Sequence, residues 1–114
     1  MDSEKGYQII ITSSAEKAYF EVLDYVFEHH PNKRANEIAL ELLEFPNVLS
    51  NFPLLGKIES ALADRSQNYR FIIYERTTQA TVKIIYYVED EQKRVYLTDF
   101  FPCEMDFIVR KKRK

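Results

Sequence analysis

The second half of the chain contains three runs of β-branched and aromatic residues that are separated only by short polar connectors. These runs are residues 69–76 (YRFIIYER), 81–88 (TVKIIYYV) and 95–101 (VYLTDFF). The connectors 77–80 and 89–94 have the length of hairpin loops, so consecutive strands are expected to pair antiparallel. This pattern constrains the fold more than any other, because three hairpin-linked strands commit half of the chain to one sheet.

The first half has a different period. Residues 7–12 (YQIIIT) form a short β-branched run that predicts a first strand. The following segment repeats apolar residues at helical spacing, which predicts a helix that ends just before Pro31. Ser13 and Glu16 have the spacing of a capping box and mark the start of this helix.

A second helix is expected next, with Asn32 as its cap and Pro46 as the residue that stops or kinks it. Residues 45–57 (FPNVLSNFPLLGK) predict a connector packed onto the core, and residues 58–68 fit either a strand or a helix. The predicted order is β-α-α-β-β-β. This is an α+β fold in which a two-helix hairpin packs on one face of a mostly antiparallel, twisted sheet.

Length and composition indicate one soluble domain: 114 residues, of which 46% are hydrophobic and 30% charged. We assign the domain to residues 1–109 and treat residues 110–114 (RKKRK) as a basic tail. The tail holds five of the 16 basic residues, which leaves 11 against 18 acidic residues, a net charge of −7 for the body. Such a body lacks the general basicity of nucleic-acid binders, so contact with nucleic acid requires a local patch.

Several classes of protein are not expected from this sequence. No apolar run is long enough to span a bilayer and the start of the chain is acidic, so a cytoplasmic protein without a membrane partner is predicted. Cys103 is the only cysteine, which excludes an internal disulfide. The adjacent His29 and His30 predict a role at a helix end rather than a metal site, and neither a metal nor a cofactor is expected.

Each C-terminal strand has one set of alternating side chains that mixes polar or charged groups with aromatic rings. In the last strand this set is Tyr96, Thr98 and Phe100. If the mixed sets share the face that no helix covers, they form one platform that contains Arg70, Tyr74, Arg76, Lys83, Tyr87 and Tyr96. Cations suit the phosphates of single-stranded RNA and rings suit its unstacked bases. Ordinary exposed strand residues would give the same pattern.

Three segments stand in a suggestive order: PLLG at 53–56, then Tyr69 and Arg70 at the start of a strand, then VKIIYYVEDEQKRVYLTDFF at 82–101. This order resembles the RelE/ParE superfamily of toxins from bacterial type II toxin–antitoxin modules. The predicted first strand and helical hairpin follow the order of the family as well, so the resemblance covers nearly the whole chain.

The resemblance implies a small toxin that a cognate antitoxin protein neutralises. RelE-like members cleave messenger RNA, usually on the ribosome and without a metal, and this activity is the leading hypothesis. ParE-like members inhibit DNA gyrase and have no known nuclease chemistry, which is the first alternative. A decayed toxin that retains only antitoxin binding is the second.

For a nuclease, the resemblance assigns phosphate binding to Arg70 and Lys83, with Tyr87 as a substitute acid. Further RNA contacts are expected from Lys57, Tyr74, Arg76 and Tyr96, and the candidate acid or base residues are Glu104 and Asp106.

The chain also departs from the family pattern. Ile72 stands where a second cation is expected, residues 102–106 (PCEMD) stand where relatives often have an arginine, and no tyrosine or histidine follows Tyr96. These departures predict an attenuated nuclease.

Overall fold

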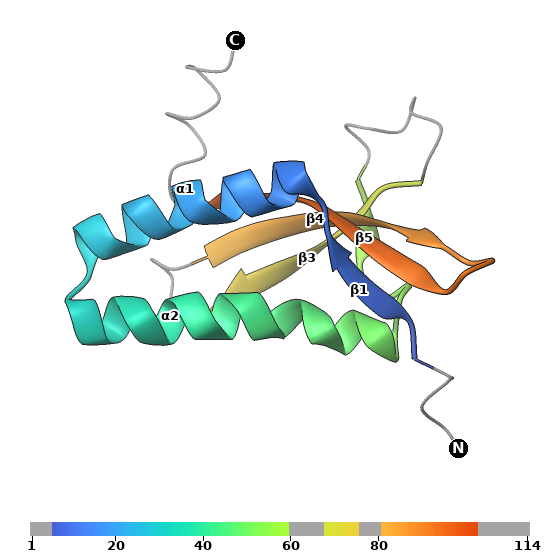
Figure 1. Ribbon diagram of the computed structural model, residues 1–114, viewed down its shortest axis with the longest axis horizontal. Coiled ribbons are helices and arrows are strands. Elements are labelled where there is room, and N and C mark those ends of the chain that lie inside the picture. Colours follow the sequence, from blue (N-terminus) through green and yellow to red (C-terminus); the bar gives the residue numbers. More distant parts are fainter. Residues whose placement is uncertain (1–5, 60–67, 76–80, 103–114) are drawn as a thin grey trace, which may run out of the picture.

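The computed structural model describes residues 6–59, 68–75 and 81–102. Two helices pack on one five-stranded sheet, in which the strands lie in the order β1-β5-β4-β3-β2 (Figure 1). The elements are β1 (Gln8–Ile11), α1 (Ser13–His29), α2 (Asn32–Glu44), η2 (Phe45–Ser50), β2 (Lys57–Ile58), β3 (Arg70–Glu75), β4 (Thr81–Glu89) and β5 (Arg94–Pro102). The predicted α+β class is confirmed.

The pairing of the strands follows from their connections. Strand β2 pairs with β3, β3 with β4 and β4 with β5, all antiparallel. The short connectors between β3, β4 and β5 require antiparallel pairing of these three strands. Strand β1 reaches the sheet before the helical hairpin, and it pairs parallel with β5 at the opposite edge. The short strand β2 was not in the predicted order. It forms at the junction of the predicted connector and residues 58–68, the segment that fitted either a strand or a helix.

The first helix begins one residue earlier than a Ser13 cap would place it. Thr12 is the N-cap, and its Oγ1 accepts a hydrogen bond from the Ala15 backbone N–H at 3.2 Å. The same hydroxyl donates to the Leu97 carbonyl of β5 at 2.7 Å. The predicted capping box at Ser13 and Glu16 is therefore wrong by one position, because Thr12 can cap the helix and bind the sheet at once.

This geometry predicts different costs for two neighbouring hydroxyl deletions. Thr12→Ala removes both hydrogen bonds and is expected to lower the free energy of unfolding by about 1–2 kcal/mol. Ser13→Ala, the matched control, changes an exposed side chain inside the first turn and is expected to cost less than about 0.5 kcal/mol. Urea denaturation of both variants measures the difference, and a larger loss for Ser13→Ala would contradict the assignment of the cap.

The second helix starts after Pro31, which is its N-cap, and no side chain caps it. Asn32 is the first helical residue, so the predicted Asn32 cap is wrong. The helix ends at Glu44, where the chain tightens into η2 with Pro46 in its first turn, as expected for a proline that cannot continue an α-helix. The hairpin is held together in part by Tyr19, whose hydroxyl donates to the Ala39 carbonyl at 2.9 Å.

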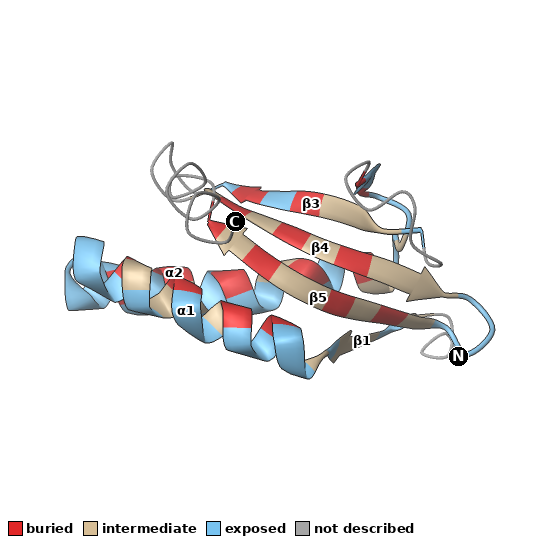
Figure 2. Cartoon of the chain, turned by 90° about the horizontal axis from the view of Figure 1, so that it is seen from above, coloured by how far each residue is buried: buried red, intermediate tan, exposed pale blue. Residues whose placement is uncertain are grey.

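The core lies between the helices and one face of the sheet. In α1 the buried residues are Ala15, Ala18, Val22 and Val26, and in α2 they are Ala35, Ile38 and Leu42. They meet every second residue of the central strands, which Figure 2 shows as alternating buried bands along β4 and β5. Val82, Ile84 and Tyr86 supply these bands in β4.

A β-bulge breaks the alternation in β5. Ile85 pairs with Asp99 but Tyr86 pairs with Leu97, so Thr98 is the extra residue on β5. The bulge shifts the inward positions from odd to even numbers, and Phe100 is therefore buried with 1% of its surface exposed. The prediction that Phe100 shares the mixed face with Tyr96 is wrong for this reason.

No helix among the described residues is both long enough and apolar enough to cross a membrane.

Candidate functional site

The register of the strands decides which side chains share the face that neither α1 nor α2 covers, here called the open face. Lys83 pairs with Ile73 on β3 and with Phe101 on β5, while Phe71 pairs with Lys57 and Ile85. Directly opposed residues in a sheet point the same way. Pairing and alternation give the open face these side chains: Lys57, Glu59, Tyr69, Phe71, Ile73, Glu75, Thr81, Lys83, Ile85, Tyr87, Glu89, Arg94, Tyr96, Asp99 and Phe101.

Lys83 is held on the open face by two contacts. Its Nζ lies 2.7 Å from Glu59 Oε1 and 4.4 Å from the centre of the Phe71 ring. The Lys83 side chain is 25% exposed and that of Glu59 only 8%, so the pair is partly desolvated and its attraction is stronger than at a free surface. The ring below the ammonium adds a cation–π contact. The open face thus carries one partly exposed cation, Lys83, whose counter-ion is the buried carboxylate of Glu59.

Glu59 gains its place from the short strand β2. Its backbone N–H donates to the Tyr69 carbonyl at 2.8 Å, which continues the β2–β3 pairing by one step. Sequence reasoning missed this residue, because it lies in the segment that fitted either a strand or a helix. The only signal in the sequence was that Lys57 and Glu59 are two residues apart and would lie on the same face of a strand. A strand of two residues is too short for this pattern to be recognised.

Three tyrosines form a row across the open face. The Tyr87 ring stacks on Tyr96 at 5.0 Å between centroids with 23° between planes, and meets Tyr69 edge-on at 5.5 Å. Tyr87 and Tyr96 lie in the neighbouring strands β4 and β5, and Tyr69 directly precedes β3; we call these three rings the tyrosine row. At one end, Arg94 Nη1 approaches the Tyr96 hydroxyl at 3.4 Å. At the other, Tyr69 stands beside Glu59 in the sheet.

Partial burial raises the pKa of Tyr87 above its ordinary value, and the neighbouring Tyr96, Tyr69 and Glu89 raise it further. A phenol with a raised pKa is a weaker acid at neutral pH and remains uncharged. This environment makes Tyr87 less suited to donate a proton, the role that the sequence suggested, than to offer a neutral ring.

Arg70 points the other way. It pairs with Tyr86, which is fully buried on the helix side of the sheet, and its Nη1 donates to the Gly56 carbonyl at 2.7 Å and reaches the Leu54 carbonyl at 3.4 Å. The prediction that Arg70 and Lys83 share the open face is therefore wrong. The guanidinium instead ties the connector before β2 to the edge of the sheet.

The buried Tyr86 completes this attachment. Its hydroxyl donates to the Pro53 carbonyl at 2.8 Å and accepts the Gly56 N–H at 2.9 Å. Burial raises the pKa of Tyr86, although the hydrogen bond from Gly56 and the charge of Arg70 act against this rise. The PLLG segment at 53–56 is thus clamped by Arg70 and Tyr86 from the sheet.

Tyr74 is also absent from the open face. It is 6% exposed, its ring meets Phe45 edge-on at 5.6 Å, and its hydroxyl donates to Glu41 Oε1 of α2 at 2.7 Å. The prediction that it belongs to an RNA platform is wrong, because it faces the helices together with Ile72. Of the predicted platform, Lys83, Tyr87 and Tyr96 share one face, and Lys57 joins them from β2.

Arg76, Glu104 and Asp106 fall outside the described residues, as do Cys103 and the tail at 110–114. The predictions for these residues remain predictions.

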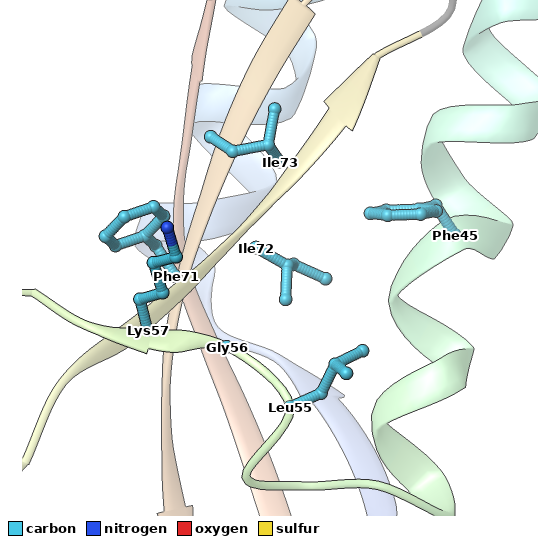
Figure 3. A pocket seen from close by; sticks show the side chains of 7 residues that line it. All are labelled: Phe45, Leu55, Gly56, Lys57, Phe71, Ile72 and Ile73. Carbon is cyan, nitrogen blue, oxygen red and sulfur yellow. The ribbon is translucent and has the colours of Figure 1, made fainter.

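A pocket of about 300 Å³ lies at the β3 edge of the sheet, lined by Phe45, Leu55, Gly56, Lys57, Phe71, Ile72 and Ile73. Figure 3 shows Lys57 and Phe71 on one side of β3 and Ile72 with Leu55 and Phe45 on the other. The lining is mostly apolar and holds no carboxylate. Lys57 is the one charged residue of this lining, and the Lys83–Glu59 ion pair is not part of it.

Within residues 6–59, 68–75 and 81–102, no group of three or more His, Cys, Asp or Glu side chains is placed to hold a metal ion.

The sequence matches no protein-family model and no curated protein. Solved structures do match. A chain of the chromosomal ParDE toxin–antitoxin system of P. aeruginosa has a TM-score of 0.65 at 12% identity, over 86% of this chain and 97% of that one.

Two further matches have a TM-score of 0.53. One is the RelBE toxin–antitoxin complex of Mycobacterium tuberculosis, at 20% identity over 85% of this chain and 98% of that one. The other is a mutant of E. coli toxin RelE in the free state, at 13% identity over 92% of each chain. Similarity at these identities speaks for architecture alone, and on that ground the chain has the α+β fold of the RelE and ParE toxins.

Proposed function

We propose that this chain is the toxin of a type II toxin–antitoxin pair, and that it acts on messenger RNA. The fold supports the first part, since it matches both a ParDE and a RelBE system over most of the chain. The partner proposed from these relatives is a cognate antitoxin protein. The second part is carried by one observation: Lys83 and Glu59 lie 2.7 Å apart on the open face.

Cleavage of RNA without a metal needs a base for the 2′-hydroxyl and a positive charge for the phosphate. Glu59 offers a carboxylate that can take the proton of the 2′-hydroxyl. The 2′-oxygen then attacks the adjacent phosphorus, the bond to the 5′-oxygen breaks, and that oxygen takes a proton from water. The products are a 2′,3′-cyclic phosphate and a 5′-hydroxyl, and Lys83 stabilises the charge that builds up on the phosphate between them.

The two residues are also held in a manner that suits this role. Phe71 supports the ammonium from below, and the backbone hydrogen bond to Tyr69 fixes Glu59. Groups that are already positioned need little rearrangement when a charge develops, which is the main source of electrostatic catalysis. In this proposal Arg70 has a structural role, and the phosphate-binding cation is Lys83 alone or with Lys57.

The proposal is tested by expressing the chain without an antitoxin. The parent is expected to arrest growth and to cleave messages at discrete positions on translating ribosomes. Lys83→Met is expected to abolish both effects, and Lys83→Arg, which keeps the charge, to retain part of them. Lys33→Met, at an exposed position in α2, serves as the control for loss of a lysine.

Circular dichroism of each purified variant separates loss of chemistry from loss of folding. Full toxicity of a folded Lys83→Met variant would remove Lys83 from the mechanism.

A second candidate is a ParE-like inhibitor that binds gyrase and cuts nothing. One observation favours it: acidic residues accompany the cations on the open face, namely Glu59, Glu75, Glu89 and Asp99. Mixed charge suits a protein surface better than a polyanion. DNA breakage in arrested cells, with messages intact, would select this candidate over RNA cleavage.

A further inference from the structure

The tyrosine row has no role in the chemistry described so far. Its central ring contacts both others, at 5.0 and 5.5 Å, and all three side chains are partly exposed on the face that carries Lys83. Cross-strand aromatic pairs do stabilise sheets, by roughly 0.2–1 kcal/mol each. A row of three that stays partly open to solvent offers, in addition, ring faces to a planar ligand.

We propose that Tyr69, Tyr87 and Tyr96 form a stacking site for the bases of single-stranded RNA, next to the phosphate held by Lys83. This inference rests on the proposed function and adds a binding site to it. Base–aromatic stacking is sequence-tolerant and is worth about tenfold or more in affinity per base. The row would therefore bind the nucleotides that flank the cleaved bond without selecting a sequence.

The positions of the charges favour RNA over an apolar peptide as the occupant. Lys83 forms an ion pair with Glu59, and the Glu59 backbone N–H donates a hydrogen bond to the Tyr69 carbonyl. The ammonium therefore lies toward the Tyr69 end of the row. Arg94 lies at the other end, beside the Tyr96 hydroxyl. A cation at each end and rings between them match a strand whose phosphates alternate with bases.

The phenols themselves agree with stacking. Burial and the neighbouring Tyr96, Tyr69 and Glu89 raise the pKa of Tyr87, so the central ring of the row stays uncharged at neutral pH. The ring planes of Tyr87 and Tyr96 differ by only 23°, so a base that lies parallel to one ring is nearly parallel to the other.

The test uses a 2′-O-methyl oligonucleotide of eight adenosines, which cannot be cleaved because its 2′-oxygen is blocked. The chain has eight tyrosines and no tryptophan, so tyrosine quenching that occurs in the parent and is lost in the row variants reports stacking. Fluorescence anisotropy of a labelled oligonucleotide gives the Kd. Tyr87→Ala is expected to raise the Kd about tenfold or more, whereas Tyr87→Phe, which keeps the ring, is expected to stay within about threefold.

Two controls keep the result specific. Tyr25→Ala removes a ring on α1 that stacks on His29 instead, and is expected to leave the Kd unchanged. An abasic oligonucleotide of the same length keeps the phosphates, so Tyr87→Ala is expected to have no effect on its binding. Tyr96→Ser provides a second variant of the row if Tyr87→Ala does not fold.

Equal Kd values for the parent and both folded row variants would overturn the proposal, as would a parent that binds abasic and adenosine oligonucleotides equally well. A parent that binds neither oligonucleotide also overturns it and leaves the row as a contact for a protein partner. Because the probe cannot be cleaved, these outcomes are independent of whether Glu59 and Lys83 catalyse cleavage.

Discussion

Gly56→Ala is expected to destabilise the protein by at least about 3 kcal/mol, at the upper end of the usual cost of overpacking. A Cβ at this position would lie 2.4 Å from the Phe71 carbonyl oxygen and 2.8 Å from the Tyr86 hydroxyl. Neither neighbour can retreat, since Phe71 is paired in the sheet on both sides and Tyr86 is fully buried. A thermal melt should show a Tm lower by about 10 °C or more.

Gly6→Ala is the matched control. Its Cβ would meet Ser50 Oγ at 2.7 Å, but that atom ends a short side chain that can rotate away. The expected loss is below about 0.5 kcal/mol, the range of ordinary surface substitutions. Similar melting temperatures for the two alanine variants would show that the connector at residues 53–56 can move away from β3, against the clamp described above.

Position 56 requires a glycine because the surrounding atoms leave no space for a Cβ. The chain has no glycine with positive φ among its described residues, so conformational freedom does not explain why a glycine stands there. The close approach of the connector to β3 does explain it. The PLLG segment that pointed to RelE and ParE toxins is, in this structure, the part of the chain that Arg70 and Tyr86 fasten to the sheet.

The elements of the fold could be predicted from the sequence because their local signals agree. The period of the apolar residues, the proline at 46 and the short polar connectors each specify one helix or strand, and the tertiary structure keeps all of them. Only β2 and the cap of each helix differ, and these depend on single residues whose partners, such as Leu97 for Thr12, lie far away in the sequence.

The open face could not be predicted in the same way. Alternation groups residues within a strand, but the grouping of different strands depends on register. In β3 both sets are apolar, Phe71 with Ile73 and Ile72 with Tyr74, so composition does not show which set faces the helices. Pairing with Tyr86 places Arg70 on the helix side of the sheet, so Arg70 does not share the open face with Lys83.

The bulge at Thr98 is a second feature that left no signal. The bulge contains neither glycine nor proline. After it, the even-numbered residues of β5 face the helices and the odd-numbered residues face the open side. Its hydroxyl donates to the Ile85 carbonyl at 3.1 Å, which stabilises the bulge through a contact between strands. The Lys83–Glu59 pair likewise joins residues far apart in the sequence, one in β4 and one just after β2, and the three-dimensional structure alone brings them together.

Glu59→Gln is expected to lower the rate constant of message cleavage by about 10²–10⁴-fold, the usual contribution of a general base. The amide keeps the size of the side chain but cannot take the proton of the 2′-hydroxyl. It also frees Lys83 from its counter-ion, since the two groups lie 2.7 Å apart. Binding of uncleavable RNA is therefore expected to tighten, with a salt dependence that steepens by about 0.7 for one additional cation on a single strand.

These opposite changes identify the base. Lys83→Met is expected to weaken both cleavage and binding, and Glu75→Gln, which removes an exposed carboxylate from the same face, is expected to change neither by more than about threefold. Single-turnover cleavage and binding titrations at several salt concentrations measure both quantities for each variant. Cleavage by Glu59→Gln at the rate of the parent would exclude Glu59 as the base. A loss of binding in this variant would mean instead that the carboxylate serves to position Lys83 over Phe71, because an ammonium without its partner would then leave the phosphate site.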